Sequence, residues 1–314
     1  MNTRKNILIT GGAGFVGSAL AERLLADENN FVVIVDDLTT GEIRKIPSLD
    51  KGNGRFIRCD VNDYRDISEV MLSFHFEYVF HYAAVVGVKR TLKNPVKVLS
   101  DLHGIENLLR LSKNNGVKRV YFSSSSEVYG EPVEIPQNES TTPLNSRLPY
   151  AIVKNAGEAY LKSYQREYGL EYTIFRFFNT YGPKQSKDFV VSRFISLALA
   201  GKDIPIYGDG MQTRTFCYVD DNIEATTNAY YKNQFVNDVV NIGGGMEIPI
   251  LELARMIIKI TGSKSQIIHL PPLKEGDMNR RVPDLVKMNK LLNRTPISLE
   301  DGLKRLLENT TYII

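Results

Sequence analysis

The stretch that decides the fold is residues 5–17, which read KNILITGGAGFVG. Residues 6–10 are rich in apolar, β-branched side chains, as in a strand buried on both faces of a parallel sheet. Glycines follow at once, and residues 15–26 (FVGSALAERLLA) carry apolar side chains at helical spacing. The stretch therefore predicts a strand, a tight glycine turn and a helix in direct succession.

The glycine turn has the pattern G-x-x-G-x-x-G. A glycine pattern alone is weak evidence, but a strand before it and a helix after it are the context that dinucleotide binding requires. Glycine lets the backbone approach the pyrophosphate, whose charge the N-terminus of the helix favours. We expect the cofactor to contact Gly11, Gly14, Phe15, Val16 and Gly17.

Acidic residues follow the next two predicted strands. Asp36 lies 19 residues beyond the last glycine of the turn, and Asp37 is next to it. A carboxylate here binds the adenosine ribose hydroxyls and repels a 2′-phosphate, so the sequence favours NAD over NADP. Asp60, with Val61 beside it, is expected to face the adenine. The alternatives are a solvated turn for the first pair and a loop carboxylate for Asp60.

Strands and helices alternate along the first half of the chain. We predict further strands at about 31–35, 55–58, 78–82, 118–123 and 172–178, and helices at about 64–73, 95–114 and 150–168. This order predicts a Rossmann-type α/β fold, a doubly wound parallel sheet with helices on both faces.

The character of the chain changes past Asn179, where a turn-rich segment precedes short strands and helices at about 189–200, 220–232, 249–261, 285–292 and 299–309. We therefore expect residues 1–178 to form an NAD-binding domain and residues 179–314 a smaller α/β lobe that binds the substrate. The boundary is soft, and a single merged domain is the alternative.

The composition is that of an ordinary globular protein, with 314 residues, 43% hydrophobic and 24% charged. The net charge of +3 is too small to predict binding to nucleic acid or to a membrane. No apolar stretch reaches the ~20 residues of a membrane helix, and the N-terminus has the pattern of a first strand rather than a signal peptide. Cys59 and Cys217 are expected to be buried thiols, and no metal-ligand pattern is identified. We expect a cytoplasmic protein.

Tyr150 and Lys154 lie four residues apart near the start of a predicted helix, so they share one of its faces. A phenol, with a reference pKa of about 10, is a poor base at neutral pH. A nearby ammonium favours the phenolate and lowers that pKa. The spacing therefore predicts that Tyr150 acts as a base activated by Lys154, which also reaches the nicotinamide ribose. The alternative is an ordinary surface pair.

A run of hydroxyls, SSSS at 123–126, ends the predicted strand at 118–123 and is followed by Glu127. Loops after the carboxyl ends of parallel strands form the ligand crevice of such folds. We expect Ser125 to hold a substrate hydroxyl opposite Tyr150, and Ser123 to lie on the cofactor side. The alternative is a polar loop.

Together these residues resemble the extended short-chain dehydrogenase/reductase superfamily, in its nucleotide-sugar epimerase/dehydratase/decarboxylase branch. The resemblance spans nearly the whole chain. It rests on the glycine turn, DDLTTG at 36–41, HYAA at 81–84, the Ser125, Tyr150 and Lys154 set, RFFNTYGP at 176–183, and YGDG at 207–210 through Arg214. The last two motifs are specific to the nucleotide-sugar branch.

The resemblance implies that Tyr150 removes a proton from the sugar's C4 hydroxyl while C4 passes a hydride to a tightly bound, recycled NAD. Ala83 and Ala84 would lie against the cofactor and Val86 against the substrate. Asn179 and Arg214 would contact the diphosphate, for which the arginine fork is suited; a surface ion pair is the alternative for Arg214. In the run GDMNRR at 276–281, Asn279 takes the position expected for another arginine, so Arg280 or Arg281 would substitute.

Three reactions can follow formation of a 4-keto sugar: 4-epimerisation, 4,6-dehydration, or decarboxylation of a C6 carboxylate. Dehydratases of the branch commonly have Asp-Glu where this chain has Ser126 and Glu127. Glu127 can remove the C5 proton, whereas Ser126 is a poor general acid. The loop VVGVKRT at 85–91 resembles epimerases more than decarboxylases.

We expect dehydratase-type chemistry on a UDP-hexose or UDP-N-acetylhexosamine, ahead of 4-epimerisation and then decarboxylation. The alternative for Glu127 is a structural ion pair, and a non-catalytic dinucleotide-binding protein is a remote reading of the whole chain. The base of the nucleotide and the sugar's C2 substituent are left open.

The resemblance also implies a homodimer in which helices 95–114 and 150–168 form a four-helix interface. The first of these helices has an apolar side made of Leu99, Leu102, Ile105, Leu108 and Leu109. Packing of that side within one chain is the alternative.

Overall fold

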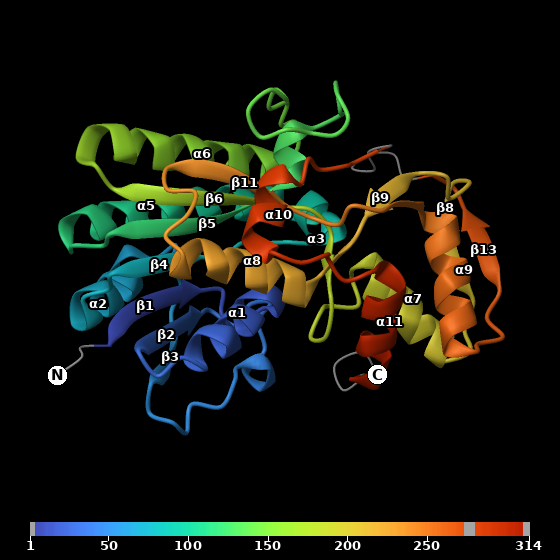
Figure 1. The fold of residues 1–314 in the computed structure, drawn as a ribbon, viewed down its shortest axis with the longest axis horizontal. Helices are drawn as coiled ribbons and strands as arrows, with labels where there is room; N and C mark the ends of the chain where they lie inside the picture. The colour runs from blue at the N-terminus through green and yellow to red at the C-terminus, as the bar shows by residue number, and fades with distance from the viewer. Residues whose placement is uncertain (1–3, 273–279, 310–314) are drawn as a thin grey trace. The chain divides into compact units, whose positions relative to one another are not determined.

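The protein is described by a computed structural model that covers residues 4–272 and 280–309 (Figure 1). These residues belong to two compact units. The first unit comprises the chain up to Val128 together with Ser146–Arg176 and Thr226–Val240. The second comprises Tyr129–Asn145, Phe177–Ala225 and the chain from Asn241 onward. The long segments of the two units meet after Arg176, and each unit also contains one short segment from the other side of that point.

A seven-stranded sheet forms the centre of the first unit, in the order β11-β6-β5-β4-β1-β2-β3. Its strands are β1 (Lys5–Thr10), β2 (Asn30–Asp36), β3 (Gly54–Arg58), β4 (Tyr78–His81), β5 (Arg119–Ser125), β6 (Glu171–Phe177) and β11 (Asp238–Ile242). β1 pairs in parallel with β2 and β4, and the pairs β2–β3 and β4–β5 are also parallel. Strand order reverses between β1 and β4, which is where doubly wound sheets bind their ligands. The predicted Rossmann-type fold is confirmed.

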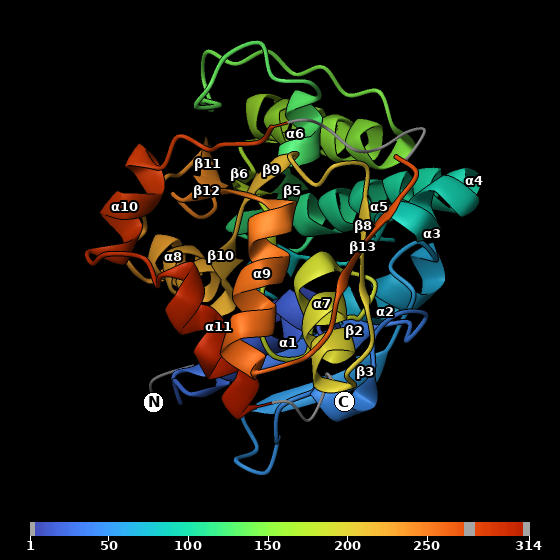
Figure 2. The same cartoon turned by 90° about the vertical axis from the view of Figure 1, so that its right-hand side faces the viewer.

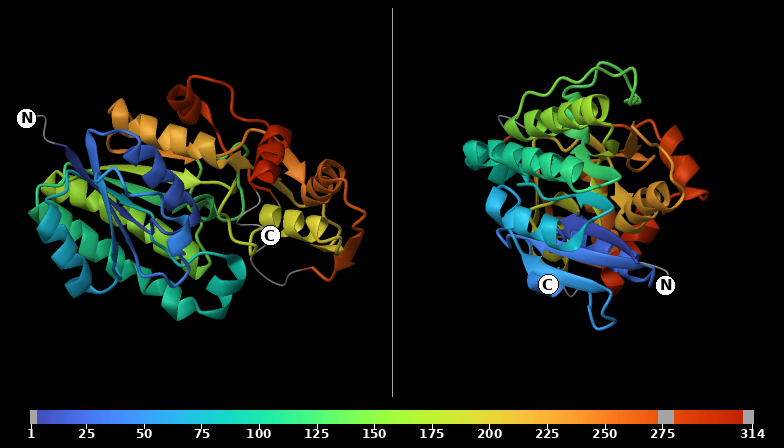
Figure 3. Two further views of the ribbon diagram at one scale, coloured as in Figure 1. Left: turned by 90° about the horizontal axis from the view of Figure 1, so that it is seen from below. Right: turned by 90° about the vertical axis from the view of Figure 1, so that its left-hand side faces the viewer.

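Helices cover both faces of this sheet (Figure 3). On one face, Leu8, Val79 and Val120 pack in a core with α2 (Tyr64–Phe74), α5 (Asp101–Asn114) and α6 (Pro149–Tyr168). The opposite face carries α1 (Phe15–Leu25) and a stack of aromatic rings, in which the Phe80 and Tyr121 centroids lie 4.4 Å apart. Because side chains alternate along a strand, each strand contributes to both cores, which explains its nearly continuous apolar sequence.

The helix expected at 95–114 is divided, which corrects that prediction. After α3 (Val88–Lys93), α4 (Pro95–Leu99) begins with a proline at its first position, where the missing N–H costs nothing. Ser100 separates α4 from α5. Its hydroxyl donates to the Val96 carbonyl at 3.2 Å, a back-bond that bends helices.

The residues on the apolar side of this divided helix differ in how deeply they are buried. Ile105, Leu108 and Leu109 are buried in the core of the first unit, and Leu102 is partly buried against it. Leu99 is 41% exposed. Packing within one chain, the alternative to a dimer interface, therefore accounts for most of this stripe.

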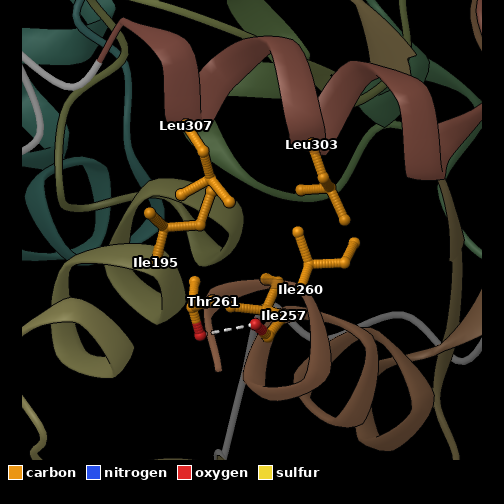
Figure 4. A pocket seen from close by; sticks show the side chains of 6 residues that line it. All are labelled: Ile195, Ile257, Ile260, Thr261, Leu303 and Leu307. Carbon is orange, nitrogen blue, oxygen red and sulfur yellow. Dashed lines mark hydrogen bonds between the residues drawn. The ribbon is translucent and has the colours of Figure 1, made fainter. Parts of the chain in front are cut away.

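In the second unit, α7 (Val190–Leu199), α9 (Ile250–Thr261) and α11 (Leu299–Glu308) pack together (Figure 2). A small apolar pocket between them is lined by Ile195, Ile257, Ile260, Thr261, Leu303 and Leu307 (Figure 4). The Thr261 hydroxyl donates back to the Ile257 carbonyl of its own helix at 2.7 Å. The pocket is thus a seam between packed helices and presents no reactive group.

Short strand pairs complete the second unit. β8 (Ile204–Tyr207) pairs in parallel with β13 (Ile267–Leu270), and β7 (Thr180–Tyr181) with β10 (Cys217–Tyr218). β9 (Thr213–Thr215) pairs antiparallel with β12 (Glu247–Pro249). Among the described residues, the remaining helices are α10 (Val286–Leu292) of the second unit and the short helix η1 (Ile43–Lys45) of the first. Residues of both units form α8 (Val219–Tyr231) and the short helix η2 (Ser126–Tyr129).

Cys59 and Cys217 are both buried free thiols, as expected. Burial raises the pKa of Cys59 to about 12, so it stays protonated at neutral pH. Within residues 4–272 and 280–309, no helix is both long enough and apolar enough to cross a membrane.

Candidate active site

The glycine turn closes tightly on the loop that follows β4. Gly11 has a φ of +70°, and a Cβ atom there would lie 2.6 Å from the Ala83 nitrogen. A Cβ atom at Gly17 would lie 2.2 Å from the Gly11 carbonyl oxygen. Neither position can hold a side chain, so the glycines here are required by close backbone approach.

The N-terminus of α1 is open to an anion. Gly14 is its N-cap residue, and in the described part of the chain no side chain caps the helix and no acidic residue lies in its first turn. The first N–H groups of a helix normally receive a side-chain cap, and the helix dipole favours negative charge there. The turn and the uncapped helix therefore fit the pyrophosphate of a dinucleotide.

Asp36 is buried against the glycine turn. Its carboxylate accepts hydrogen bonds from the backbone nitrogens of Ala13 at 3.0 Å and Leu38 at 2.9 Å. Burial raises the pKa of Asp36, and these two hydrogen bonds oppose that rise. Asp37 instead accepts from the nitrogen and hydroxyl of Thr39, at 2.8 and 2.6 Å, within a local turn. The two neighbouring acids thus have different environments, and Asp36 is the one held beside the turn.

Hydrogen bonds join the carboxyl ends of three adjacent strands. The Thr10 hydroxyl of β1 bonds His81 Nδ1 of β4 at 2.8 Å and accepts from the Ala83 nitrogen at 3.2 Å. The Ser123 hydroxyl of β5 donates to the His81 carbonyl at 3.2 Å. Burial lowers the pKa of His81 to about 3, so the ring is neutral near pH 7. Thr10 was missed at the sequence level, although a strand-end hydroxyl before the glycines could have indicated it.

Tyr150 and Lys154 share one face of α6, as their spacing predicts. Lys154 is 2% exposed, and its Nζ lies 5.8 Å from the centre of the Tyr150 ring and 4.8 Å from that of Phe122. The Ser123 hydroxyl lies 3.5 Å from the same nitrogen. Burial lowers the pKa of Lys154 to about 8, while the charge of Asp101 opposes the fall. A buried ammonium beside a phenol ring is the arrangement that favours a phenolate.

The serine run passes from strand to turn beside this pair. Ser125 is the last residue of β5, and its hydroxyl accepts from the Glu127 nitrogen at 3.2 Å. Ser126 is buried, whereas Glu127 is partly exposed. Ser124 points elsewhere: its hydroxyl donates to the Glu158 carboxylate at 2.6 Å.

Sequence reasoning missed a buried ion pair that joins α6 to the sheet. Glu158, 1% exposed, accepts from Arg176 of β6 through both carboxylate oxygens, at 2.9 Å from Nε and 2.7 Å from Nη2. Glu158 follows Lys154 by four residues, as Lys154 follows Tyr150. That recurrence on one helix face could have indicated it.

The loop after β4 carries the remaining predicted contacts of the first unit. Ala83, Ala84 and Val86 are all partly exposed. The Val86 carbonyl accepts from Arg90 Nη1 at 3.1 Å. Asp60 and Val61 lie in the loop after β3, where the Asp60 carboxylate accepts from the Asn62 nitrogen at 2.9 Å. Both loops lie at the carboxyl edge of the sheet, and the loop after β4 closes on the glycine turn at Ala83.

The predicted diphosphate contacts belong to the second unit. Asn179 donates to the Thr215 carbonyl at 3.1 Å. Arg214 is largely buried and donates to the Thr213 carbonyl at 2.7 Å.

The two neighbouring arginines differ. Arg280 is exposed and forms a bidentate ion pair with Glu247, at 2.8 and 2.7 Å, whereas Arg281 is buried. Asn279 and the Gly-Asp pair before it lie outside the described residues. Within the described ranges there is no cluster of three or more His, Cys, Asp or Glu that could hold a metal ion.

The chain is similar to enzymes that act on nucleotide sugars. It is 37% identical to the putative UDP-glucose 4-epimerase of Methanocaldococcus jannaschii, over 96% of this chain and 97% of that protein. It is 38% identical to the UDP-N-acetyl-alpha-D-glucosaminuronate decarboxylase of Bacillus cytotoxicus, over 97% of each. The structure of UDP-glucose 4-epimerase from Thermotoga maritima with UDP-glucose matches with a TM-score of 0.90 and 35% identity, over 97% of this chain and 98% of that one.

Other similar proteins include UDP-glucuronic acid decarboxylases and dTDP-glucose 4,6-dehydratases, and some of the similar structures contain NAD. The family model described as the NAD dependent epimerase/dehydratase family matches residues 7–243. That match spans the glycine turn, the serine run and the Tyr150–Lys154 pair. The chain is therefore an NAD-dependent enzyme and belongs to the epimerase/dehydratase family.

Proposed function

We propose that this enzyme oxidises C4 of a UDP-sugar and then reduces the same carbon from the other face, so that it acts as a 4-epimerase. The observation that carries the C4 oxidation is the buried ammonium of Lys154 beside the Tyr150 ring, close to the strand that ends in Ser125. The choice of epimerisation rests on Ser126, a buried hydroxyl at the position where elimination would need a proton donor. NAD, when bound, supplies the hydride acceptor and donor for this cycle.

Each residue has a defined task in the proposal. Tyr150 removes the proton of the C4 hydroxyl, Ser125 holds that hydroxyl by a hydrogen bond, and Lys154 stabilises the phenolate. A base in hydrogen-bond reach typically contributes about 10²–10⁴-fold to the rate. The cofactor would be held by Gly11, Gly14, Phe15, Val16, Gly17, Asp36, Asp37, Asp60, Val61, Ala83, Ala84 and Ser123.

UDP-sugars are the proposed substrates because the similar epimerase and decarboxylase proteins are named for them. For the diphosphate we favour Arg281, with Arg214 and Asn179, over Arg280. Arg280 forms a bidentate ion pair with Glu247, and this pairing lowers the pKa of the Glu247 carboxyl to about 2. Arg281 differs from Arg280 in being buried, and charge-assisted hydrogen bonds to a diphosphate are stronger where water is excluded.

We place epimerisation before the dehydratase-type elimination expected from the sequence. Loss of the C6 hydroxyl needs a proton donor, and Ser126, a buried hydroxyl, is a poor one. Chemistry at C5, with Glu127 as the base, is the second candidate, because Glu127 is partly exposed and its backbone nitrogen bonds the Ser125 hydroxyl. Removal of the C5 proton by Glu127, with loss of the C6 hydroxyl, would give dehydration. Decarboxylation of a C6 carboxylate instead breaks the C5–C6 bond and needs a proton delivered to C5.

The test is incubation of the NAD-loaded enzyme with UDP-glucose, UDP-N-acetylglucosamine, UDP-glucuronate and GDP-mannose in heavy water. Epimerisation predicts a product of unchanged mass without deuterium at C5. Loss of water would refute it in favour of elimination with Glu127 as the base, and loss of carbon dioxide would refute it in favour of decarboxylation.

Two variants check the assignment of the base. Tyr150→Phe should lose about 10²–10⁴-fold in kcat. The matched control is Tyr168→Phe, an exposed tyrosine on the same helix, which should retain activity. Equal activity of the two variants would contradict the role of Tyr150.

We further propose that the enzyme is a homodimer. Exposed apolar side chains on α4 and α6, which contact one another, offer the surface: Val96, Leu99, Ile152 and Tyr160. Light scattering of the unmodified chain should give twice its 35.5 kDa, and Val96→Glu should reduce that mass by half. A monomeric unmodified chain would rule this surface out.

A further inference from the structure

The inference concerns Asp101, the first residue of α5, which neither the sequence motifs nor the proposed function uses. Its side chain is buried, at 9% exposure. A buried carboxylate is costly unless hydrogen bonds and charges compensate it. One compensation is its place at the start of a helix, where the dipole favours negative charge.

Asp101 and the next turns of α5 bind two loops at the carboxyl edge of the sheet. The carboxylate accepts from the Val85 nitrogen at 2.8 Å and from Asn62 Nδ2 at 3.5 Å. The nitrogen of Gly104 donates to Asn62 Oδ1 at 3.0 Å, and a Cβ atom on Gly104 would lie 2.7 Å from that oxygen. Asn107 donates to the Val61 and Asn62 carbonyls, at 3.1 and 3.2 Å.

These contacts make one helix the support of both loops. The first loop carries Asp60 and Val61, and the second carries Ala83 to Val86, which are all proposed ligand contacts. Since the Asp101 carboxylate accepts a hydrogen bond from each loop, it couples the position of one loop to that of the other.

Asp101 and Lys154 lie on α5 and α6, which pack against each other, and their charges interact. Around Lys154, β4 contributes His81, which is neutral, and β5 contributes the Ser123 hydroxyl and the Phe122 ring. Tyr150 is the titratable neighbour on its own helix. Among these described neighbours, Asp101 is the acidic residue.

We propose that Asp101 is a positioning residue for the reacting pair: it joins the loops after β3 and β4 and provides the counter-charge of Lys154. The proposal rests on the assignment of Tyr150 and Lys154 in the proposed function. It predicts two separable effects, one on loop position and one on the charge of Lys154.

The test follows the charge state of Lys154 directly, without turnover. In the full chain labelled with ¹³C at lysine, the Cε resonance of Lys154 is assigned by its absence from Lys154→Met and titrated with pH. Asp101→Asn keeps an acceptor for the Val85 nitrogen but removes the charge. It should lower the titration midpoint of Lys154 by about one pH unit, the shift that about 1.4 kcal/mol of lost charge interaction produces.

Three further variants make the result specific. Asp101→Glu keeps the charge and should titrate like the unmodified chain. Glu106→Gln removes the same charge from an exposed position on the same helix and should leave the midpoint unchanged. Asp101→Ser, whose hydroxyl suits a helix start, replaces Asp101→Asn if that variant does not fold. The same titration in Tyr150→Phe separates the lysine from the phenol.

The loop effect has its own measurement. Asp101→Ala loses the acceptor as well as the charge, so it should retain less NAD on purification than Asp101→Asn. In active preparations, the fall of kcat/KM at alkaline pH should begin at lower pH in Asp101→Asn.

An unchanged titration midpoint of Lys154 in Asp101→Asn would overturn the role of Asp101 as the counter-charge. Equal NAD retention by Asp101→Asn and Asp101→Ala would overturn its role in positioning the loops. Because the titration needs no substrate, a wrong assignment of the reaction would leave its outcome unaffected.

Discussion

Replacing Glu158 by glutamine tests whether the buried ion pair fixes α6, and with it Tyr150 and Lys154, to the sheet. The change keeps the size of the side chain and removes its charge. Arg176, 2% exposed, would then be a buried cation beside a neutral amide. Removing one member of a buried pair typically costs about 3–5 kcal/mol, because the remaining charge is left uncompensated.

The contacts of Glu158 favour the upper part of that range. Its carboxylate accepts two hydrogen bonds from Arg176, and a third comes from Ser124, which lies between two predicted site residues. Lys162, at 3.8 Å, is 44% exposed and adds little. We therefore expect the free energy of unfolding to fall by about 4 kcal/mol, together with a lower kcat.

Urea unfolding followed by circular dichroism measures the effect, with Glu77→Gln as the matched control. Glu77 pairs with Lys118 at 2.6 Å, but the lysine is 60% exposed, so breaking that pair should cost less than about 1 kcal/mol. Equal losses in the two variants would refute the reasoning from burial. A stability loss in Glu158→Gln with kcat intact would show that the pair holds the fold without positioning Tyr150.

Two further predictions follow from the charged residues. Arg281→Ala should raise the KM for a UDP-sugar about 10-fold or more through loss of a charge-assisted hydrogen bond, whereas Arg280→Ala should change that KM little. Steady-state kinetics measures both variants, and a larger KM increase in Arg280→Ala would contradict the choice of Arg281. Lys154 binds its proton more weakly in the folded chain than in the unfolded chain, so its contribution to stability is unfavourable below pH 8 and improves as the pH rises toward about 10. The difference in the urea midpoint of unfolding between the unmodified chain and Lys154→Met should therefore become smaller from pH 8 to about pH 10. A difference that stays constant with pH would contradict the lowered pKa of Lys154.

The sequence predicted the sheet and its cofactor edge because the physical signals there are local. A buried strand, a glycine turn and an apolar helix face can each be recognised within about a dozen residues. Tyr150 and Lys154 lie within one helical turn, so their shared face follows from spacing alone. The same reasoning failed at Ser100, where a side-chain back-bond divides a helix whose apolar pattern is continuous.

The elements that the sequence did not reveal depend on contacts between distant segments. β11 is a five-residue strand from the last third of the chain, and its pairing with β6 leaves no local pattern. Asp101 meets Val85 across 16 positions, and Glu158 meets Arg176 across 18. A carboxylate on a predicted helix is usually solvated, so burial, which gives both acids their significance, had to come from the structure.

The polar groups of the first unit are concentrated where its strands end. Thr10, His81 and Ser123 lie toward the carboxyl ends of β1, β4 and β5, while the two residues just before each of them are apolar and buried. This edge can position the C4 hydroxyl, the base and its ammonium in the same way for epimerisation, dehydration or decarboxylation, because all three begin with oxidation at C4. The reaction that follows must then be decided by groups that reach C5 and C6. In the first unit those candidates are Ser126 and Glu127, so substitution of Glu127 should separate C5 chemistry from hydride return, whereas substitution of Tyr150 should abolish both.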